Sequence, residues 1–152
     1  MKQTQAYAAI QRKMAPGVIT RDGFLGEDRR NLVDILTQDD GEARRLGFRH
    51  QDIALRMVEL RDSGLAGLGE FIDVEPHFEV RVDSVRGKLP CPFGDPGIFQ
   101  KTNTTVRNKH LGREVTYTDL HIHLILAHGF YEGRGGPFRL EPKDLAEVLE
   151  IA

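Results

Sequence analysis

Three of the six histidines in this 152-residue chain fall within eight residues, in the segment YTDLHIHLILAHGF. They are His121, His123 and His128, and leucine and isoleucine occupy most of the positions between them. Imidazole is a frequent zinc ligand and also the side chain best suited to acid–base chemistry near neutral pH. The segment is therefore a candidate metal site or acid–base site.

What these histidines can do depends on whether residues 119–128 form a strand or a helix. In a strand, His121 and His123 lie on the same face and can bind one metal ion together. In a helix, the same two residues lie about 200° apart around the axis. His121 and His128 then share a face, but they are roughly 10 Å apart along the axis, which is too far for one ion.

We expect a helix in this segment. Thr118 and Asp119 are typical of a helix N-terminus, and Gly129 suits the position that follows a C-terminus. The alternation of polar and apolar residues, which favours a strand, stops at Leu124. Histidines on a half-buried helix also occur as packed or hydrogen-bonded residues without any ligand, and that alternative stays open.

A zinc site needs a further ligand, and the single cysteine, Cys91 in LPCPFGD, has the right chemistry because a thiolate with two imidazoles suits zinc. The predicted zinc ligands are Cys91, His121, His123 and His128. Three more residues carry donor atoms of a suitable type, namely Asp95, His77 and His110. No CxxC, HExxH or HxxxH pattern joins these residues. Cys91 also fits a small buried hydrophobic residue between two prolines.

Catalysis without a metal has two candidate residues. Glu132, in HGFYEGRGG, is a candidate general base and lies close in sequence to His128. A pair of Cys91 with a histidine is a further arrangement, for nucleophilic catalysis. The sequence contains no GxSxG motif, and a glutamate in a glycine-rich loop is more often solvated than catalytic. The sequence leaves open whether the protein is an enzyme.

A run of basic residues marks a candidate anion-binding surface, since no acidic residue occurs between Asp95 and Glu114. The candidates are Lys101, Arg107 and Lys109 on one predicted strand face, and Arg134 and Arg139 around a glycine-rich loop. Such residues can hold a phosphate, a carboxylate or a nucleic-acid backbone. They also fit a solvent-facing sheet surface whose lysines discourage edge pairing, and we favour that interpretation.

Residues 43–57 resemble a helix-turn-helix DNA-binding unit. The segment EARRLGFRHQDIALRM has Ala43, Gly47 and Ile53 at the spacing seen in such units, which implies a recognition helix after the glycine. The match departs at Arg56, where the pattern is usually apolar, and at the preceding DDG, where the first helix should be continuous. A helical corner packed on a sheet explains the same residues, so we do not expect nucleic acid as a partner.

Local patterns predict the secondary structure. A first helix follows Asp28, its candidate N-cap, a second covers about 42–46, and the strongest covers 50–64, with Gly64 as its C-terminal stop. The prolines and glycines of KLPCPFGDPG predict an irregular loop. The alternation in PHFEVRVDSV predicts a strand buried on one side, and TNTTVRN with REVTYTD predicts a β-hairpin joined by KHLG. A short C-terminal helix has Pro142 in its first turn.

These elements predict one α+β domain over residues 1–152. A weakly patterned segment, 1–26, precedes a helical part, 27–70, and then residues 71–152 hold the sheet and the closing helices. We expect the N-terminal helices to pack on a small antiparallel sheet of about three strands, followed by the histidine-rich helix and the short C-terminal helix.

Composition narrows the functional classes. The formal net charge of −2 and the isoelectric point near 6.3 point to neither nucleic acid nor an anionic membrane. The N-terminus has no apolar run of a signal peptide, and no run is long enough to cross a membrane. One cysteine fits a reducing compartment, so we expect a cytoplasmic protein without a membrane partner. Homo-oligomerisation stays open.

The sequence therefore favours a small binding or interaction protein with no chemistry of its own. One alternative is a zinc-binding protein or metal-dependent hydrolase that uses Cys91 and the histidine segment. A second alternative is a DNA-binding regulator that acts through residues 43–57.

Overall fold

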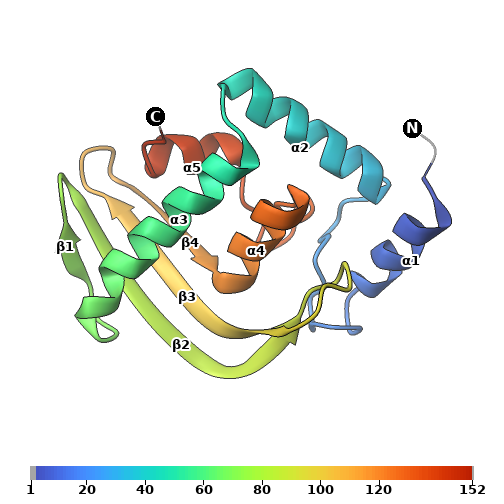
Figure 1. The fold of residues 1–152 in the computed structure, drawn as a ribbon, viewed down its shortest axis with the longest axis horizontal. Coiled ribbons are helices and arrows are strands. Elements are labelled where there is room, and N and C mark those ends of the chain that lie inside the picture. The colour runs from blue at the N-terminus through green and yellow to red at the C-terminus, as the bar shows by residue number, and fades with distance from the viewer. Residues whose placement is uncertain (1–2, 152) are drawn as a thin grey trace.

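An antiparallel sheet underlies the fold in the computed structural model, which describes residues 3–151 (Figure 1). Within that range the sheet has four strands in the order β1-β2-β3-β4. Their bounds are Ile72–Val74 for β1, Phe78–Pro90 for β2, Ile98–Asn108 for β3 and Arg113–Thr118 for β4. The α+β class is confirmed, with four strands where about three were expected. The additional strand, β1, is only three residues long and too short to show a period.

The strand patterns explain this sheet. Phe78, Val80 and Val82 of β2 are buried while the residues between them are only partly buried, which confirms the one-sided strand. Val106 of β3 pairs with Val80 and continues the same buried face. The β3–β4 hairpin is confirmed, with residues 109–112 as its four-residue connection.

The β2–β3 hairpin is longer than its sequence suggests. Pairing is interrupted between Val85 and Lys88 and then resumes as far as Pro90, which lies opposite Ile98. We expected an irregular loop over all of KLPCPFGDPG, but only residues 91–97 form it. A proline is tolerated at the end of a strand because no ladder N–H is needed there.

The helices are α1 (Gln5–Lys13), α2 (Leu32–Leu46), α3 (His50–Gly64), α4 (Asp119–His128) and α5 (Pro142–Val148), with a 3-10 turn, η1 (Leu65–Gly67). None of these helices, which are those of residues 3–151, is both long enough and apolar enough to span a bilayer. The short C-terminal helix and the histidine helix are confirmed, and Leu145 and Val148 of α5 are buried.

Two expectations about the N-terminal helices are wrong. Residues 32–46 form one helix rather than two, since Gly41 lowers helix stability by only about 1 kcal/mol relative to alanine and the buried Leu32 and Ile35 hold the helix in place. Its N-cap is Asn31 and not Asp28. Helix α1 was not expected in the weakly patterned segment 1–26.

Helix α3 has the bounds that its pattern predicts, and Ile53, Met57 and Leu60 form its buried stripe. Gly64 was expected to stop this helix, but it lies inside the last turn. A Cβ atom added to Gly64 would overlap the side chain of Val80. Glycine at this position therefore allows the end of α3 to approach β2 closely.

Helix α4 lies between two hydrophobic clusters. Ile122 and Ile125 belong to the cluster formed with α3, the sheet and α5. Leu120 and Leu124 belong to the other cluster, which includes Cys91 and residues around α1 and the start of α2. A helix that is apolar on several sides is buried on several sides, and this position brings α4 next to the tip of the β2–β3 hairpin (Figure 1).

Candidate metal centre

The ends of α4 are fixed by local hydrogen bonds. The Thr118 hydroxyl accepts the His121 N–H at 3.1 Å, and the Thr118 N–H donates to His121 Nδ1 at 3.0 Å. At the other end Gly129 is left-handed, with φ 61°, and its N–H donates to the Ile125 carbonyl at 3.0 Å. These caps explain why the segment is a helix despite its partly alternating pattern.

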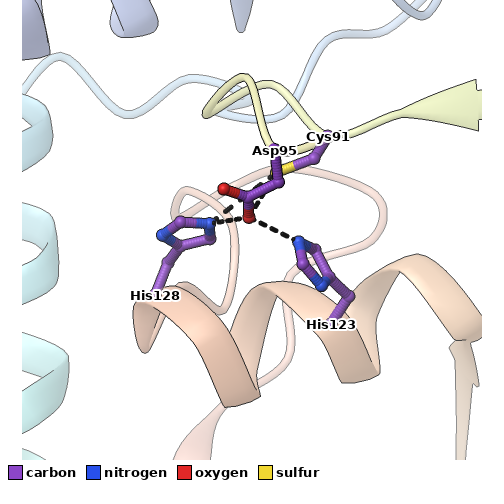
Figure 2. Close-up of side chains that lie close together, drawn as sticks. All are labelled: Cys91, Asp95, His123 and His128. Atoms are coloured by element: carbon purple, nitrogen blue, oxygen red, sulfur yellow. Dashed lines mark hydrogen bonds and ion pairs between the residues drawn. The ribbon is translucent and has the colours of Figure 1, made fainter. Parts of the chain in front are cut away.

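The loop 91–97 presents a thiol and a carboxylate from the tip of the β2–β3 hairpin. The Gly94 N–H donates to the Cys91 carbonyl at 3.0 Å, which forms a tight turn between Cys91 and Asp95. Gly94 has a φ of 91°, a conformation that other residues rarely adopt. The turn places the side chains of Cys91 and Asp95 toward α4 (Figure 2).

Four side chains converge where this loop meets α4 (Figure 2). One donor atom from each of Cys91, Asp95, His123 and His128 lies within 4.8 Å of all the others. Asp95 Oδ2 lies 2.7 Å from His123 Nε2 and 2.5 Å from His128 Nε2. Cys91 Sγ lies 3.6 Å from the same oxygen and 3.8 Å from His128 Nε2.

Two of these four separations match those of a tetrahedral zinc site. Zn–N distances of ≈2.0–2.1 Å and Zn–S distances of ≈2.3 Å place the donor atoms of such a site roughly 3.3–3.8 Å apart. The two distances from Cys91 Sγ agree with this range. The contacts of Asp95 with the two imidazoles are shorter and are hydrogen bonds, so an ion would require this side chain to move by about 1 Å. Asp95 is one-third exposed, at 33%, and has room to move.

The surroundings of the four side chains affect their protonation. The hydrogen bond from His128, with a further one from His123, lowers the pKa of Asp95 below its ordinary value. Burial raises the pKa of the Cys91 thiol. Without a cation the thiol is therefore neutral at pH 7 and the carboxylate is charged, so the cluster carries negative charge next to two imidazoles.

Aromatic rings restrict the two imidazoles. Phe93 stacks on His128 with 3.9 Å between ring centroids and an interplanar angle of 8°. Phe99 lies against His123 with 4.6 Å between centroids. Rings held in this way lose little conformational freedom when they bind a ligand, and the aromatic side chains keep part of the solvent away.

His121 is not part of this cluster. It lies in the first turn of α4, roughly 10 Å along the axis from His128, and its Nε2 is 2.5 Å from Glu132 Oε2. Of the four predicted metal ligands the structure thus brings together Cys91, His123 and His128, and the fourth member of the group is Asp95. The other two donors that were considered, His77 and His110, lie against each other with ring centroids 5.3 Å apart, and His77 bonds to Glu150.

The two catalytic candidates lie in different places. Glu132 contacts His121, whereas His128 contacts Asp95, so the expected proximity of Glu132 and His128 does not produce an acid–base pair between them. The pairing of Cys91 with a histidine is present, at 3.8 Å from His128.

Most candidate anion-binding residues are engaged with carboxylates. Arg107 pairs with Glu114, and Lys109 pairs with Asp73. Arg139 has a nearly buried side chain and forms a bidentate ion pair with Asp39. Lys101 lines a cavity beside α4, and the backbone N–H of Arg134 donates to Asp28. Arg107, Lys109 and Arg139 thus already have carboxylate partners, which lie on different elements.

The Arg139 ion pair joins the C-terminal loop to α2. Its guanidinium donates to both oxygens of Asp39, at 2.6 and 2.9 Å, and also to Glu141. Burial of the guanidinium opposes these contacts, but the pairing with carboxylates raises the pKa of Arg139 further above its ordinary value. Asp39 was not singled out in the sequence, where it is one of two adjacent aspartates in an exposed-looking DDG.

The segment that resembles a helix-turn-helix unit spans the end of α2 and most of α3. Gly47, with φ 87°, ends α2 and forms the corner. Arg49 contacts Asp52, and Arg56 donates from Nε to the Leu149 carbonyl at 2.8 Å. One of its arginines therefore ties α3 to the C-terminal segment, as a packed helical corner requires. DNA binding by this segment stays the second alternative.

Asp95 is the member of the cluster that sequence reasoning ranked too low. The sequence feature that indicates Asp95 as a ligand is its position four residues after Cys91, in a loop where Gly94 and Gly97 permit tight turns. His123 and His128 were not paired either, since they lie about 140° apart around a helix. Both reach Asp95 because its carboxylate lies between them (Figure 2).

The chain matches no protein-family model, and neither curated proteins nor solved structures contain a match to it. Functional conclusions therefore depend on the geometry of this chain alone.

Proposed function

We propose that this protein binds one zinc ion through Cys91, Asp95, His123 and His128. The observation that carries the proposal is the convergence of four donor atoms within 4.8 Å from two elements that are far apart in sequence. The chemistry of the donors supports zinc, because thiolate, imidazole and carboxylate are its usual protein ligands. Calcium and magnesium prefer oxygen ligands and do not suit this set.

Charge balance also supports a divalent cation. A thiolate and a carboxylate together carry two negative charges, which Zn²⁺ neutralises while both imidazoles remain neutral. A neutral site suits a cluster in which Cys91 is 4% exposed, because an unpaired buried charge is unfavourable. A zinc ion would lower the pKa of the thiol, which burial alone raises.

Four protein ligands favour a structural ion over a catalytic one. Catalytic zinc sites keep one coordination position for water or substrate, whereas structural sites are completed by the protein. The ion would join the tip of the β2–β3 hairpin to α4, in addition to the apolar contacts that Cys91 and Phe93 make there. We infer a zinc-stabilised binding protein of a reducing compartment such as the cytoplasm, with no hydrolase activity of its own.

Metal analysis tests the proposal directly. The protein is purified without a histidine tag and without chelator, loaded with zinc, desalted and analysed for metal per chain. We expect close to one zinc per chain, and at least about a 100-fold loss of affinity in His123→Ala and Cys91→Ser, since even second-shell changes lower affinity 10- to 100-fold. Cobalt in place of zinc should give a sulfur-to-cobalt charge-transfer band that Cys91→Ser abolishes.

Two control histidines make the test specific. His110→Ala changes an imidazole away from the cluster, and His121→Ala changes the imidazole nearest to it in sequence. Both variants should retain one zinc per chain. Absence of zinc from the parent protein after loading would contradict the proposal, and loss of zinc in His121→Ala alone would mean that a different ligand set is used.

A further inference from the structure

A cavity of about 360 Å³ lies beside the start of α4, where Thr118, Leu120 and His121 line it. Its volume is in the range of small-molecule pockets. The segment around Phe24, the β2–β3 arm, the start of α4 and the loop that carries Glu132 together line it. None of the four proposed zinc ligands is among its lining residues, so the cavity is a separate feature and an inference from it does not depend on zinc.

The polar group of this cavity is the pair formed by Glu132 and His121, whose side chains are 8% and 4% exposed. His121 Nδ1 accepts the Thr118 N–H, so Nε2 carries the imidazole proton and donates it to Glu132 Oε2 at 2.5 Å. Both ring nitrogens are then occupied. His121 holds the carboxylate in position and has no atom left to bind a ligand.

The Glu132 carboxylate has an acceptor that is not used within the protein. Among the described residues, Oε2 has one donor, the neutral His121 imidazole, and Oε1 takes part in no hydrogen bond. Oε1 is also not among the fully enclosed polar atoms without a partner, so it can be reached from the cavity. A nearly buried carboxylate without a cation is unfavourable unless a ligand supplies one.

The backbone holds Glu132 in this position. Its φ is 69°, in the left-handed region, which is unfavourable for a residue other than glycine. The Glu132 carbonyl accepts from Arg139 Nη1 at 2.8 Å, and the next residue, Gly133, donates from its N–H to the Phe24 carbonyl at 2.8 Å. A strained conformation that its neighbours enforce is common at binding sites.

The rest of the lining is mainly apolar, with charges toward the solvent. Phe24, Leu89 and Leu120 provide apolar walls. Lys101 is only partly buried, and Arg21 and Asp22 are exposed. The lining thus carries two positive and two negative groups, and the most deeply buried of them is the Glu132 carboxylate.

We propose that this cavity binds a small primary amine with an apolar body. The ammonium group would pair with Glu132 Oε1 at the enclosed end, and the apolar body would contact the walls. Lys101, which is more exposed than Glu132, disfavours a second cationic group near it. A buried carboxylate also disfavours an anionic ligand at the enclosed end, so the site should distinguish amines from carboxylic acids of the same shape.

Benzylamine, benzyl alcohol and benzoate are suitable probes because they share one apolar body and differ in the head group. Each is titrated at pH 7 into the ¹⁵N-labelled protein, and amide chemical shifts are recorded. We expect saturable shifts at His121, Glu132 and Gly133 with benzylamine, and at least about tenfold weaker binding of benzoate, since hydrogen bonds to charged groups are the strong ones. Absence of saturation with benzylamine, or shifts confined to other regions, would overturn the proposal.

Two variants are expected to change the affinity for benzylamine in opposite directions. Misfolding would weaken binding in both variants, so it cannot produce this result. Glu132→Gln should weaken benzylamine binding about tenfold and remove the preference for amine over alcohol. Lys101→Met should strengthen benzylamine binding a few-fold by removing a like charge. The exposed Glu114→Gln serves as the matched control and should change nothing. Equal binding of benzoate and benzylamine in the parent protein, or no response to either variant, would exclude the ammonium site.

Discussion

The two histidines of α4 that are nearest to each other in sequence, His121 and His123, have different partners although both contact a carboxylate. His121 is 4% exposed and bonds to Glu132 beside a cavity, while His123 is 22% exposed and bonds to Asp95 in a cluster with a thiol and a second imidazole. The reason is the helical rotation of about 200° between them. The His123–Asp95 pair therefore lies beside Cys91 and His128, which complete a set of four metal donors. The His121–Glu132 pair leaves Glu132 Oε1 facing a cavity.

The carboxylates differ in how they are held. Asp95 lies in a short loop at the tip of a hairpin, and among residues 3–151 its side chain is hydrogen-bonded only to members of the cluster. Glu132 follows α4 in a loop that is tied to two other regions, through Arg139 to Asp39 and through the Arg134 N–H to Asp28. We therefore expect the metal side of α4 to depend on the ion, and the cavity side to depend on these ion pairs and hydrogen bonds.

Removal of zinc should have the largest effect, and only on the metal side. With free zinc at about 1,000 times its dissociation constant, binding stabilises the folded state by about 4 kcal/mol, which a chelator removes. Chemical denaturation with zinc and with excess chelator measures the difference. Hydrogen exchange should accelerate in residues 91–97 and stay unchanged in 131–133. Equal acceleration in both segments would show that the two sides of α4 are not independent.

Breaking the buried Arg139 ion pair should have the next largest effect, on the cavity side. Asp39→Ala leaves a guanidinium that is 6% exposed without its bidentate partner. Loss of one member of a buried pair lowers the free energy of unfolding by about 3 kcal/mol, and Glu141 compensates only in part. Denaturant titration measures this loss, and zinc content should stay at the parent value. Asp62→Ala, which removes an exposed partner of Arg61, is the control and should change stability by less than about 0.5 kcal/mol.

Loss of the Asp28 anchor should have the smallest effect of the three and should depend on pH. Burial alone would raise the pKa of Asp28, but hydrogen bonds from Arg30 and from the Arg134 N–H outweigh it and lower the pKa from 3.8 to about 2. The group therefore stabilises the folded state above pH 3.8, by about 2 kcal/mol, and this contribution disappears as the pH falls toward 2.

Asp28→Asn should accordingly lower the free energy of unfolding by about 2 kcal/mol at pH 7. The difference between the parent protein and the variant should shrink between pH 4 and pH 2, and unfolding titrations across that range measure it. A difference that is constant with pH would mean that the carboxylate charge of Asp28 is not what stabilises this loop.

The elements could be predicted where their signals are local. The bounds of α3, the one-sided pattern at the start of β2 and the β3–β4 hairpin follow from period and turn chemistry within a few residues. The division of α2 into two helices was wrong because the expected break at Gly41 is a weak local preference that burial of Leu32 and Ile35 overrides. Strand β1 could not be predicted from local patterns either, because its three residues form a strand only through pairing with β2.

The sequence by itself favoured a helix over residues 119–128, because the capping residues Thr118 and Gly129 lie directly beside that segment, and it determined that Cys91, His123 and His128 have the chemistry of zinc ligands. Only the tertiary structure decided that Asp95 joins them and that His121 pairs with Glu132 instead. The physical reason is distance along the chain. The position of Asp95 depends on the length and register of the β2–β3 hairpin. That of Glu132 depends on its loop, which one ion pair and one backbone hydrogen bond tie to residues about a hundred positions away.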